Sequence, residues 1–598
     1  MSIYRAPVRE LSFLINEIAG LNEIRELPGF EDATPELVDS VLEECARFAQ
    51  EVIAPLNRTG DRQGCRLTTH GVATADGWRA AYRAYCDAGW NGVTAPAPYG
   101  GQGLPGVVGL AVREMTAAAN LSFSLCPMLT VGAIEALLTC ASQTLRSLYL
   151  QPMVAGTWTG TMNLTEPQAG SDLASVATRA EPQPDGSYRI FGQKIFITYG
   201  DHDLTENIVH LVLARCPDAP PGVKGISLFL VPKILVNPDG TLGAPNDVRC
   251  ASVEHKLGIH ASPTCVMMFG EREGATGYLL GEAHRGLEYM FIMMNEARMG
   301  VGLQGIGVAE RAYQQALAYA RDRKQGRDAE TGRRLVTIDR HPDVRRMLMT
   351  MKSRIEALRA LTMYAAGLLD RAHGNREEAA RLRYRQLAEF LIPLVKGGGT
   401  EMAVDVSSLG IQVHGGMGYI EETGAAQHWR DARITTIYEG TTGIQGNDLV
   451  VRKLLRDGGD TARAIFAQVR ESASELEASD RPQLQEIGQH IVAALEAWEA
   501  ATDWILTRAR DAPAEVLAAA VPYLALSVAV AGGWQLGRAA AAAARRLDRS
   551  RGDPSFDGAK IATARYYAAS QLPQASALSA VVRQAGPALA AVGDEALG

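Results

Sequence analysis

The chain has 598 residues, more than a single hydrophobic core usually organises, so we expect about three or four domains. Apolar residues make up 47% and charged residues 21%, a balance that excludes a chain disordered throughout. The formal net charge of −8 gives no indication of nucleic acid or an anionic membrane as the main partner, but it leaves room for an anionic ligand in a local pocket.

Residues 1–158 are predicted to form a helical domain. Thr34 can cap a helix whose first residue is Pro35. The Gly/Pro-rich loop 95–105 predicts a break before a further apolar helix. The opening sequence MSIYRAPVRELSFL lacks a basic segment followed by an apolar one, so we expect a protein that is not secreted. The apolar stripe of the capped helix consists of Val38, Val41, Leu42 and Cys45.

Residues 159–283 have a different pattern and are predicted to form a β domain. Short apolar runs recur at 187–198 (SYRIFGQKIFIT), 210–216 (HLVLARC) and 226–233 (ISLFLVPK). Turn sequences such as QPDG and NPDG bound them, as expected for strands in a compact, barrel-like sheet.

Residues 284–455 return to a helical period and are predicted to form a helical bundle. Residues 456–598 are Ala-rich and predict an additional helical domain. The fold class expected is therefore α+β multidomain: an N-terminal helical domain, a central β-barrel-like domain, a helical bundle and an extra C-terminal helical domain. One core stripe of the last domain is formed by Leu484, Ile487, Ile491, Leu495 and Trp498.

The stretch 514–536 is long and apolar enough to be mistaken for a membrane span. It is Ala-rich, carries Glu515 and Pro522, and lacks an aromatic belt at each end. We therefore expect a buried helix pair and no stable membrane insertion.

All eight cysteines precede position 266, and no two stand at CxxC spacing. The 11 histidines form no HExxH or similar pattern, so we expect no metal site. This usage is typical of reduced, mostly buried thiols in a cytoplasmic protein.

Two glycine-rich segments imitate nucleotide-binding motifs. Residues 300–305 match GxGxxG, but the flanking sequence predicts one continuous helix where a dinucleotide site needs a preceding strand. We expect these glycines to allow close helix packing. Residues 397–400 (GGGT) lack the order of a phosphate-binding loop and predict a close helix contact or a break.

The first candidate for chemistry is MNLTEPQAGSD at 162–172. Small residues in AGSD leave backbone N–H groups exposed, and these can hold a phosphate or a ring carbonyl. The hydroxyls of Thr165 and Ser171 are additional donors. The alternative is an ordinary turn that Ser171 and Asp172 cap locally.

The second candidate is the strand GQKIFIT at 192–198. Strand alternation places Phe196 and Thr198 on one side. An aromatic ring and a hydroxyl on one face suit a flat heteroaromatic cofactor, but they equally suit an ordinary half-buried strand.

The third candidate combines QVHGGMGY at 412–419 with RITTIYEGTTGIQ at 433–445. The glycines allow the backbone to approach a ligand closely. Glu439 follows an aromatic residue, and a lone Glu in such a place is usually solvated, so its local chemistry does not single it out.

These strings, with KLGIHASPT at 256–264 and in this order over roughly residues 40–455, resemble the acyl-CoA dehydrogenase family. The short N-terminal segment and the extra C-terminal region are similar to its larger bacterial branch. That branch includes broad-range fatty acyl-CoA dehydrogenases and 3-methylmercaptopropionyl-CoA dehydrogenases. Straight-chain and methylthio-substituted acyl groups both stay open.

The resemblance implies an FAD-dependent enzyme of fatty acid β-oxidation that converts an acyl-CoA to the trans-2-enoyl-CoA. Glu439 would be the base that removes the α-proton. Its backbone N–H and a ribityl hydroxyl would polarise the thioester carbonyl. A free Glu has a pKa of about 4.3, so the site has to exclude water and acidify the substrate.

The resemblance also assigns binding roles by position. The FAD-binding positions are Met162, Leu164, Thr165, Gly170, Ser171, Phe196, Ile197, Thr198, Arg323, Gln412, Gly415, Gly416 and Thr441. Substrate-binding positions are Ser171, Asn295, Arg298, Tyr438 and Gly440.

The chain departs from the family pattern at three places. RKQG at 323–326 lacks the usual aromatic residue, and Gly443 replaces a common Gln. Some relatives carry the base one residue before Arg298, where this chain has Ala297. Glu296 is displaced by about 100° around the helix, so Glu439 has no rival.

The expected partners are an electron-transfer flavoprotein and a second copy of the chain. The C-terminal region is expected to cover the surface that smaller relatives use to form tetramers, which leaves a homodimer. The alternatives are a basic-rimmed membrane-contacting helix at 538–551, an oxidase that reduces oxygen to peroxide, and a non-catalytic acyl-CoA or FAD-binding protein.

Overall fold

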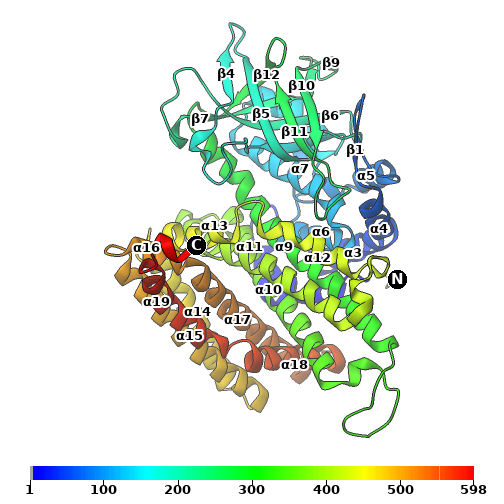
Figure 1. The fold of residues 1–598 in the computed structure, drawn as a ribbon, viewed down its shortest axis with the longest axis vertical. Coiled ribbons are helices and arrows are strands. Elements are labelled where there is room, and N and C mark those ends of the chain that lie inside the picture. The colour runs from blue at the N-terminus through cyan, green and yellow to red at the C-terminus, as the bar shows by residue number, and fades with distance from the viewer. Residues whose placement is uncertain (1–3, 551, 598) are drawn as a thin grey trace. The chain divides into compact units, whose positions relative to one another are not determined.

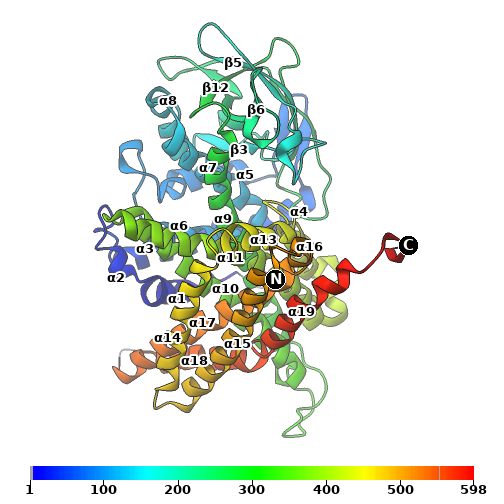
Figure 2. The same cartoon turned by 90° about the vertical axis from the view of Figure 1, so that its left-hand side faces the viewer.

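The structure is a computed structural model that describes residues 4–550 and 552–597 (Figures 1 and 2). It divides into two compact units. The sheet unit contains Cys45–Leu104 and Met115–Gly300. The helical unit contains the described residues of Met1–Glu44, Pro105–Glu114 and Val301–Gly598. The predicted fold class, with helical, β and helical parts, is confirmed.

The sheet unit is built on a curved sheet with the strand order β10-β11-β5-β12-β7-β6-β3, drawn in cyan and green in Figure 1. β4 pairs with both β5 and β6. The three strands predicted from the sequence are confirmed as β5, β6 and β7. The strands are β3 (Trp158–Asn163), β4 (Arg179–Pro182), β5 (Tyr188–Thr198), β6 (Asn207–Arg215), β7 (Ile226–Pro232), β10 (Val248–Val253), β11 (Thr264–Phe269) and β12 (Ala275–Leu280), with the separate pair β8 (Ile234–Val236) and β9 (Leu242–Pro245).

Helices of the sheet unit pack near β3, which is buried along nearly its whole length. Gly160 in β3 lets α7 approach, because a Cβ there would meet the Ala133 side chain at 2.4 Å. The helices of this unit are α4 (Ala54–Gln63), α5 (Trp78–Asp87), α7 (Leu121–Cys140) and α8 (Gln143–Val154), of which α7 and α8 contact β3.

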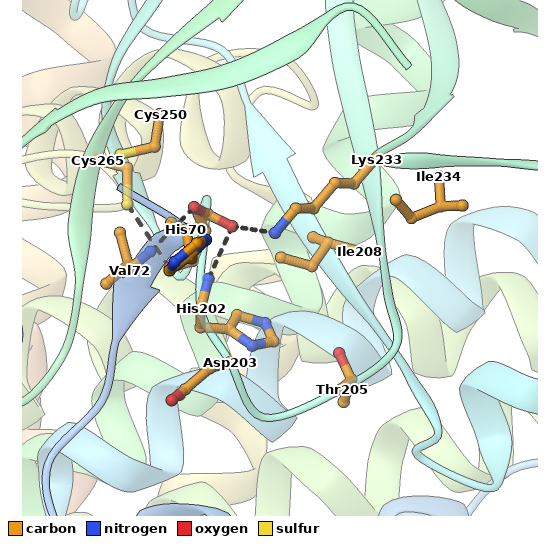
Figure 3. Close-up of polar contacts among 12 residues, drawn as sticks. His70, Val72, His202, Asp203, Thr205, Ile208, Lys233, Ile234, Cys250 and Cys265 are labelled. Atoms are coloured by element: carbon orange, nitrogen blue, oxygen red, sulfur yellow. Dashed lines mark hydrogen bonds and ion pairs between the residues drawn. The ribbon is translucent and has the colours of Figure 1, made fainter. Parts of the chain in front are cut away.

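A small hairpin, β1 (Arg66–Thr68) and β2 (Gly71–Ala73), interrupts the N-terminal region that was predicted to be mostly helical. β1 is exposed throughout, so it has no apolar alternation that a sequence pattern could reveal. Asp201 ties the hairpin to the sheet: its carboxylate accepts from the Val72 N–H at 3.1 Å and from Lys233 Nζ at 2.5 Å (Figure 3).

The helical unit consists of long helices from both ends of the chain. The Thr34 cap is confirmed, since its hydroxyl accepts from the Leu37 N–H at 3.2 Å. The helices are α1 (Val8–Leu14), α2 (Leu21–Ile24), α3 (Pro35–Phe48), α6 (Gly106–Ala119), α9 (Gly286–Asp322), α10 (Pro342–Gly374), α11 (Glu378–His414), α12 (Ala425–Ala432), α13 (Thr442–Asn447), α14 (Asp460–Glu477), α15 (Pro482–Arg508), α16 (Pro513–Ala518), α17 (Ala520–Asp548), α18 (Pro554–Ser570) and α19 (Gln574–Ala590), of which α3, α6 and α9 also contribute residues to the sheet unit.

Among the residues that the structure describes, two helices, α7 and α17, are long and apolar enough to cross a membrane by length and composition. In the most apolar window of each, 83% and 72% of the residues are buried inside the structure. Both are therefore core helices. The buried pair predicted for 514–536 is confirmed for α17 but is wrong for α16, in which only Val516 is buried. Figure 2 shows α17 among α14, α15 and α18, which it contacts.

The GxGxxG match lies inside α9, as predicted, and serves close packing. A Cβ on Gly302 would meet the Val395 carbonyl oxygen at 2.6 Å, and one on Gly305 would meet that of Gly399 at 2.4 Å. α11 runs unbroken through the GGGT segment, so the close-contact reading is confirmed and the alternative of a helix break is wrong.

Buried ion pairs connect both ends of the chain to α10. Arg359 donates to Glu114 of α6 at 2.7 Å and to Glu310 of α9 at 2.8 Å. Lys560 of α18, 3% exposed, pairs with Glu356 at 2.8 Å and with Glu10 of α1. The C-terminal extension is thus an integral part of the helical unit.

Replacing Lys560 with Ala should lower the free energy of unfolding by about 3–5 kcal/mol, because two buried carboxylates lose a cation. Chemical denaturation monitored by circular dichroism measures the change. The matched control is Arg481→Ala, which removes an exposed pair with Asp548 (38% and 61% exposed) and should change it by less than about 1 kcal/mol. Equal effects of the two substitutions would contradict a stabilising role for the buried ion pairs of Lys560.

Candidate active site

In the sheet unit, the loop after β3 is held by a buried ion pair. Lys194 of β5 donates to Glu166 Oε1 at 2.7 Å and to the Leu164 carbonyl at 3.0 Å. The side chains of Lys194 and Glu166 are 0% and 3% exposed. Glu166 also accepts from Thr178 (N and Oγ1) and from the Ala177 N–H. Glu166 is therefore a fixed anchor for the six residues that follow it in the TEPQAGSD string, 167–172.

This environment keeps the pair ionised at neutral pH. Burial lowers the pKa of Lys194 to about 8, against the opposing charge of Glu166. Burial alone would raise the pKa of Glu166, but the Lys194 ammonium and the hydrogen bonds from Lys194, Thr178 and Ala177 outweigh it, so this pKa is lowered.

The hydroxyls predicted to bind a cofactor are available. Within the described residues, the side chains of Thr165, Ser171 and Thr198 take part in no protein hydrogen bond. The backbone of Thr165 is joined to β5, since the Ile195 N–H donates to its carbonyl at 2.9 Å. Asp172 accepts from the Ala174 N–H at 2.9 Å, so the local-cap alternative holds for Asp172.

Phe196 lies at an irregularity of β5. The register with β11 shifts opposite Ile195 and Phe196, and Phe196 has a φ of +59°. Its ring is 59% exposed, whereas Ile197 is 2% exposed and belongs to the core of the sheet unit. A large exposed ring on an ordered strand fits a flat ligand stacked against it. Only the backbone of Ile197 remains for a ligand.

At two of the predicted FAD-binding positions, nothing in the described part of the chain requires a glycine. A Cβ on Gly170 or Gly416 would meet nothing within 4 Å, and neither residue has a positive φ. Such positions accept any residue unless something outside the protein approaches the backbone. Both therefore fit the close approach of a cofactor. Met162 and Leu164, on either side of the buried Asn163, are partly buried.

Asn295 and Arg298 lie in the part of α9 that belongs to the sheet unit. Arg298 is 3% exposed, with its guanidinium carbon 5.9 Å from the Phe291 ring centroid. Ala297 is 4% exposed and carries no base, as predicted.

In the helical unit, the predicted residues fall into two groups. Arg323, Gln412, Gly415 and Gly416 are exposed, at the end of α9 and around the end of α11. Gly415 ends α11 with a φ of +60°. Among the described residues, no hydrogen bond or ion pair joins Arg323 or Gln412 to the segment Tyr438–Thr441.

The second group is the loop from Ile437 to Thr441, which precedes α13. We call it the base loop. Glu439 is partly buried and has a φ of +55°, and Gly440 follows with a φ of +90°. The Tyr438 hydroxyl donates to Gln304 of α9 at 2.5 Å. Burial, and then the charge of Glu439, raises the pKa of Tyr438, which keeps its hydroxyl protonated.

The end of the base loop is capped. The Thr441 hydroxyl accepts from the Ile444 N–H at 3.3 Å and starts α13. Thr442 donates to Glu401 of α11 at 2.5 Å. Thr441 thus has a structural role, and its hydroxyl hydrogen stays available for a ligand.

Sequence reasoning missed two residues of this loop's surroundings. Lys396 Nζ donates to the Gly440 carbonyl at 2.6 Å, and Gln445 Nε2 donates to the carbonyls of Glu439 and Gly440, each at 3.2 Å. Both side chains are fully buried. The available signal was a lone Lys in the apolar run Ile392–Gly399, because a buried lysine requires an acceptor.

Within the described residues, no group of three or more His, Cys, Asp or Glu side chains could hold a metal ion. All eight cysteines are free thiols, and most are buried, as predicted.

Four family models match the chain in sequence order. They are the acyl-CoA dehydrogenase N-terminal domain (36–157), middle domain (161–271) and C-terminal domain (284–454), and the "Acetyl-CoA dehydrogenase C-terminal like" domain (465–592). The match therefore extends through the C-terminal extension.

Relatives of similar length are known. The chain is 49% identical over 587 residues to the 3-methylmercaptopropionyl-CoA dehydrogenase of Ruegeria pomeroyi, covering 98% of this chain and 99% of that one. It is 35% identical to the broad-specificity linear acyl-CoA dehydrogenase FadE5 of Mycobacterium tuberculosis (96% of each chain) and 34% identical to a butyryl-CoA dehydrogenase of Syntrophomonas wolfei (95% of each).

Solved structures share the fold. ACDH-11 of Caenorhabditis elegans in complex with C11-CoA superposes with a TM-score of 0.76 at 20% identity, over 96% of this chain and 92% of that chain. An acyl-CoA dehydrogenase of Bacillus anthracis complexed with FAD gives 0.74 at 20% identity, over 98% and 93%.

The Glu166–Lys194 pair predicts a pH-dependent stability. Because the pKa of Glu166 is lowered on folding, its contribution is present above the ordinary value of 4.5 and is lost as the pH falls through the folded value. Glu166→Gln should lower the free energy of unfolding of the sheet unit by about 3–5 kcal/mol at pH 7, since it leaves Lys194 without its anion.

Denaturation at several pH values measures this effect. The difference between wild type and Glu166→Gln should shrink below pH 4.5, where the wild-type carboxylate becomes protonated. Glu181→Gln, at an exposed pair with Arg179, is the control with little expected effect. A difference that stays constant with pH would refute the assignment.

Proposed function

Because this chain belongs to the acyl-CoA dehydrogenase family, a family of FAD-dependent enzymes, we propose that Glu439 is the base that removes the α-proton of its acyl-CoA substrate. The product is the trans-2-enoyl-CoA. The observation that carries the assignment is the base loop: a partly buried carboxylate, in a backbone conformation unusual for any residue but glycine, held by three neighbouring helices.

FAD, when bound, accepts the hydrogen that leaves the β-carbon as hydride. The chain's own residues supply the rest. Glu439 takes the α-proton at its carboxylate, and its backbone N–H donates to the thioester oxygen as negative charge develops there. Ala297 offers no competing base on α9.

The residues of the sheet unit suit the flavin. Thr165 and Thr198 would donate to the ring, Phe196 would pack on it, and Ser171 with the backbone at Gly170 would hold the pyrophosphate. Their free hydroxyls, exposed ring and open space support this set. Met162, Leu164 and Ile197 would contribute through backbone and packing.

Further FAD contacts are proposed for the helical unit. Arg323, Gln412, Gly415 and Gly416, all exposed, would reach the FAD of a second copy of the chain. Thr441 would donate its hydroxyl hydrogen to FAD.

For the substrate we propose a short acyl-CoA with a methylthio group. The 49% identical relative carries that substrate in its name. The first half of α9, which would line the acyl pocket with Asn295 and Arg298, also contains the partly buried Met294. Thioether side chains are polarizable and adapt to a sulfur-containing ligand. Straight-chain acyl groups are the alternative, favoured by the two 34–35% identical relatives.

We further propose that the enzyme is a cytoplasmic homodimer that passes electrons to an electron-transfer flavoprotein. The integral packing of the C-terminal extension against α10 and α11 supports the dimer, since the extension then occupies a helix surface that a smaller relative would leave open. Light scattering tests this state, and a stable tetramer would count against it. Peroxide release during turnover would indicate an oxidase.

Glu439→Gln should retain yellow FAD but bleach at least about 10³-fold more slowly when acyl-CoA is added without oxygen, because the amide cannot accept the α-proton. Stopped-flow absorbance measures the rate. Glu296→Gln, which changes the carboxylate one residue before Ala297 on α9, is the matched control and should bleach at the wild-type rate. Bleaching of Glu439→Gln at the wild-type rate would overturn the assignment.

A panel of acyl-CoAs should rank the substrates. The bleaching rate divided by the apparent Kd is expected to be highest for the 3-methylthiopropionyl thioester and lower for its isosteric straight-chain analogue, pentanoyl-CoA. One methylene changes binding in an apolar pocket by only about 1–3 kcal/mol, so the isostere is the stringent comparison. Equal ratios for the two thioesters would show that the enzyme does not prefer the methylthio group.

A further inference from the structure

The base loop contains two consecutive residues in the left-handed region. Gly440 adopts its φ of +90° without penalty, but Glu439 at +55° carries a Cβ, which costs about 1–2 kcal/mol. Contacts from outside the loop must offset this strain.

Two buried donors supply those contacts. Lys396 approaches from α11 and Gln445 from α13, and together they donate to the carbonyls of both left-handed residues at 2.6–3.2 Å. The fit is close: a Cβ on Gly440 would meet Gln445 Nε2 at 2.8 Å. Only glycine therefore allows this arrangement at position 440.

Stability does not explain Gln445. Gln445 is 0% exposed, and within the described part of the chain its Oε1 has no hydrogen-bond partner. An unsatisfied buried acceptor costs about 1–3 kcal/mol, which a methionine of similar size would avoid. Lys396 is also 0% exposed, so its ammonium group requires acceptors inside the protein, and the Gly440 carbonyl is one of them. What both residues contribute is a donor aimed at the base loop.

We propose that Lys396 and Gln445 are positioning residues that set the direction of the Glu439 side chain; this inference rests on the proposed role of Glu439 as the base. Peptide groups are planar, so fixing the carbonyl oxygens of Glu439 and Gly440 fixes the two peptide planes that follow the base. The plane after Glu439 determines ψ of that residue, and with φ it determines where Cβ points.

The preceding residue is fixed independently. Tyr438 is held through its hydroxyl by Gln304, so Glu439 is clamped on both sides. Proton transfer from carbon requires the carboxylate within hydrogen-bond reach of the α-hydrogen. A displacement of about 1 Å lowers such a rate by about 100-fold.

The test uses the FAD-loaded full chain with Gln445→Met and Lys396→Met. Both variants should bleach about 10- to 100-fold more slowly with acyl-CoA, because the base is no longer aimed. FAD content and the Kd of a redox-inactive acyl-CoA thioether should stay near wild type. The isotope effect from α-deuterated substrate should increase more than that from β-deuterated substrate.

A second readout follows the loop itself. Hydrogen exchange in peptides covering 437–447 should accelerate in both variants, with and without FAD, while exchange elsewhere is unchanged. Gln535→Met, an equally buried glutamine of α17, and Lys453→Met, which removes an ion pair with Glu389, are matched controls with no expected effect on bleaching or on this exchange.

Glu439→Gln, measured in parallel, separates this inference from the proposed function. If Glu439→Gln is inactive while Gln445→Met and Lys396→Met bleach and exchange like wild type, the positioning role is wrong. Acceleration of exchange throughout the helical unit would also overturn it, since the donors would then serve overall stability. If Glu439→Gln itself bleaches at the wild-type rate, the proposed role of Glu439 as the base is wrong, and the positioning role that rests on it is wrong as well.

Discussion

A cation buried away from water must find an acceptor inside the protein, and this constraint organises the structure. Lys194, Arg359, Lys396 and Lys560 are four such cations, each at most 3% exposed. Arg359 of α10 pairs with Glu114 and Glu310. Lys560 of the C-terminal helix α18 pairs with Glu10 of α1 and Glu356 of α10, so these contacts join helices from both ends of the chain. Each pair is favourable only while its geometry is kept, which makes these contacts specific.

The other two cations each donate a hydrogen bond to a backbone carbonyl, and Lys194 does so in addition to its ion pair with Glu166. Lys194 donates to the Leu164 carbonyl in the loop that carries Thr165 and Ser171, and Lys396 donates to the Gly440 carbonyl beside Glu439. In both units a lysine reaches from a regular element to the loop that bears the candidate chemistry. Rigid elements thereby fix residues that lie on loops.

Glycine has two different meanings in this chain. Gly302, Gly305 and Gly399 are required by helix contact, because a Cβ there would strike a backbone oxygen. Gly170 and Gly416 face open space and are required by nothing in the protein. The sequence pattern GxGxxG belongs to the first kind, and the ligand-binding candidates belong to the second.

The sequence by itself determined the order of domains, the three longest strands of the sheet, the Thr34 cap and the helix-packing role of residues 300–305. These depend on local periodicity and turn residues, which neighbouring side chains express directly. It also determined the family, through ordered motifs. The hairpin β1–β2 was not predicted, because each strand has only three residues and β1 is exposed throughout, so no apolar alternation marks it.

Only the tertiary structure decided what holds the site. The strand pattern at 192–198 did not reveal the irregularity that exposes Phe196, because that shift depends on pairing with β11. Lys396 and Gln445 lie 43 residues before and 6 residues after Glu439, and no local pattern relates them to it. Their role arises when α11 and α13 pack against the base loop, since hydrogen bonds to backbone carbonyls carry no sequence signature at the acceptor.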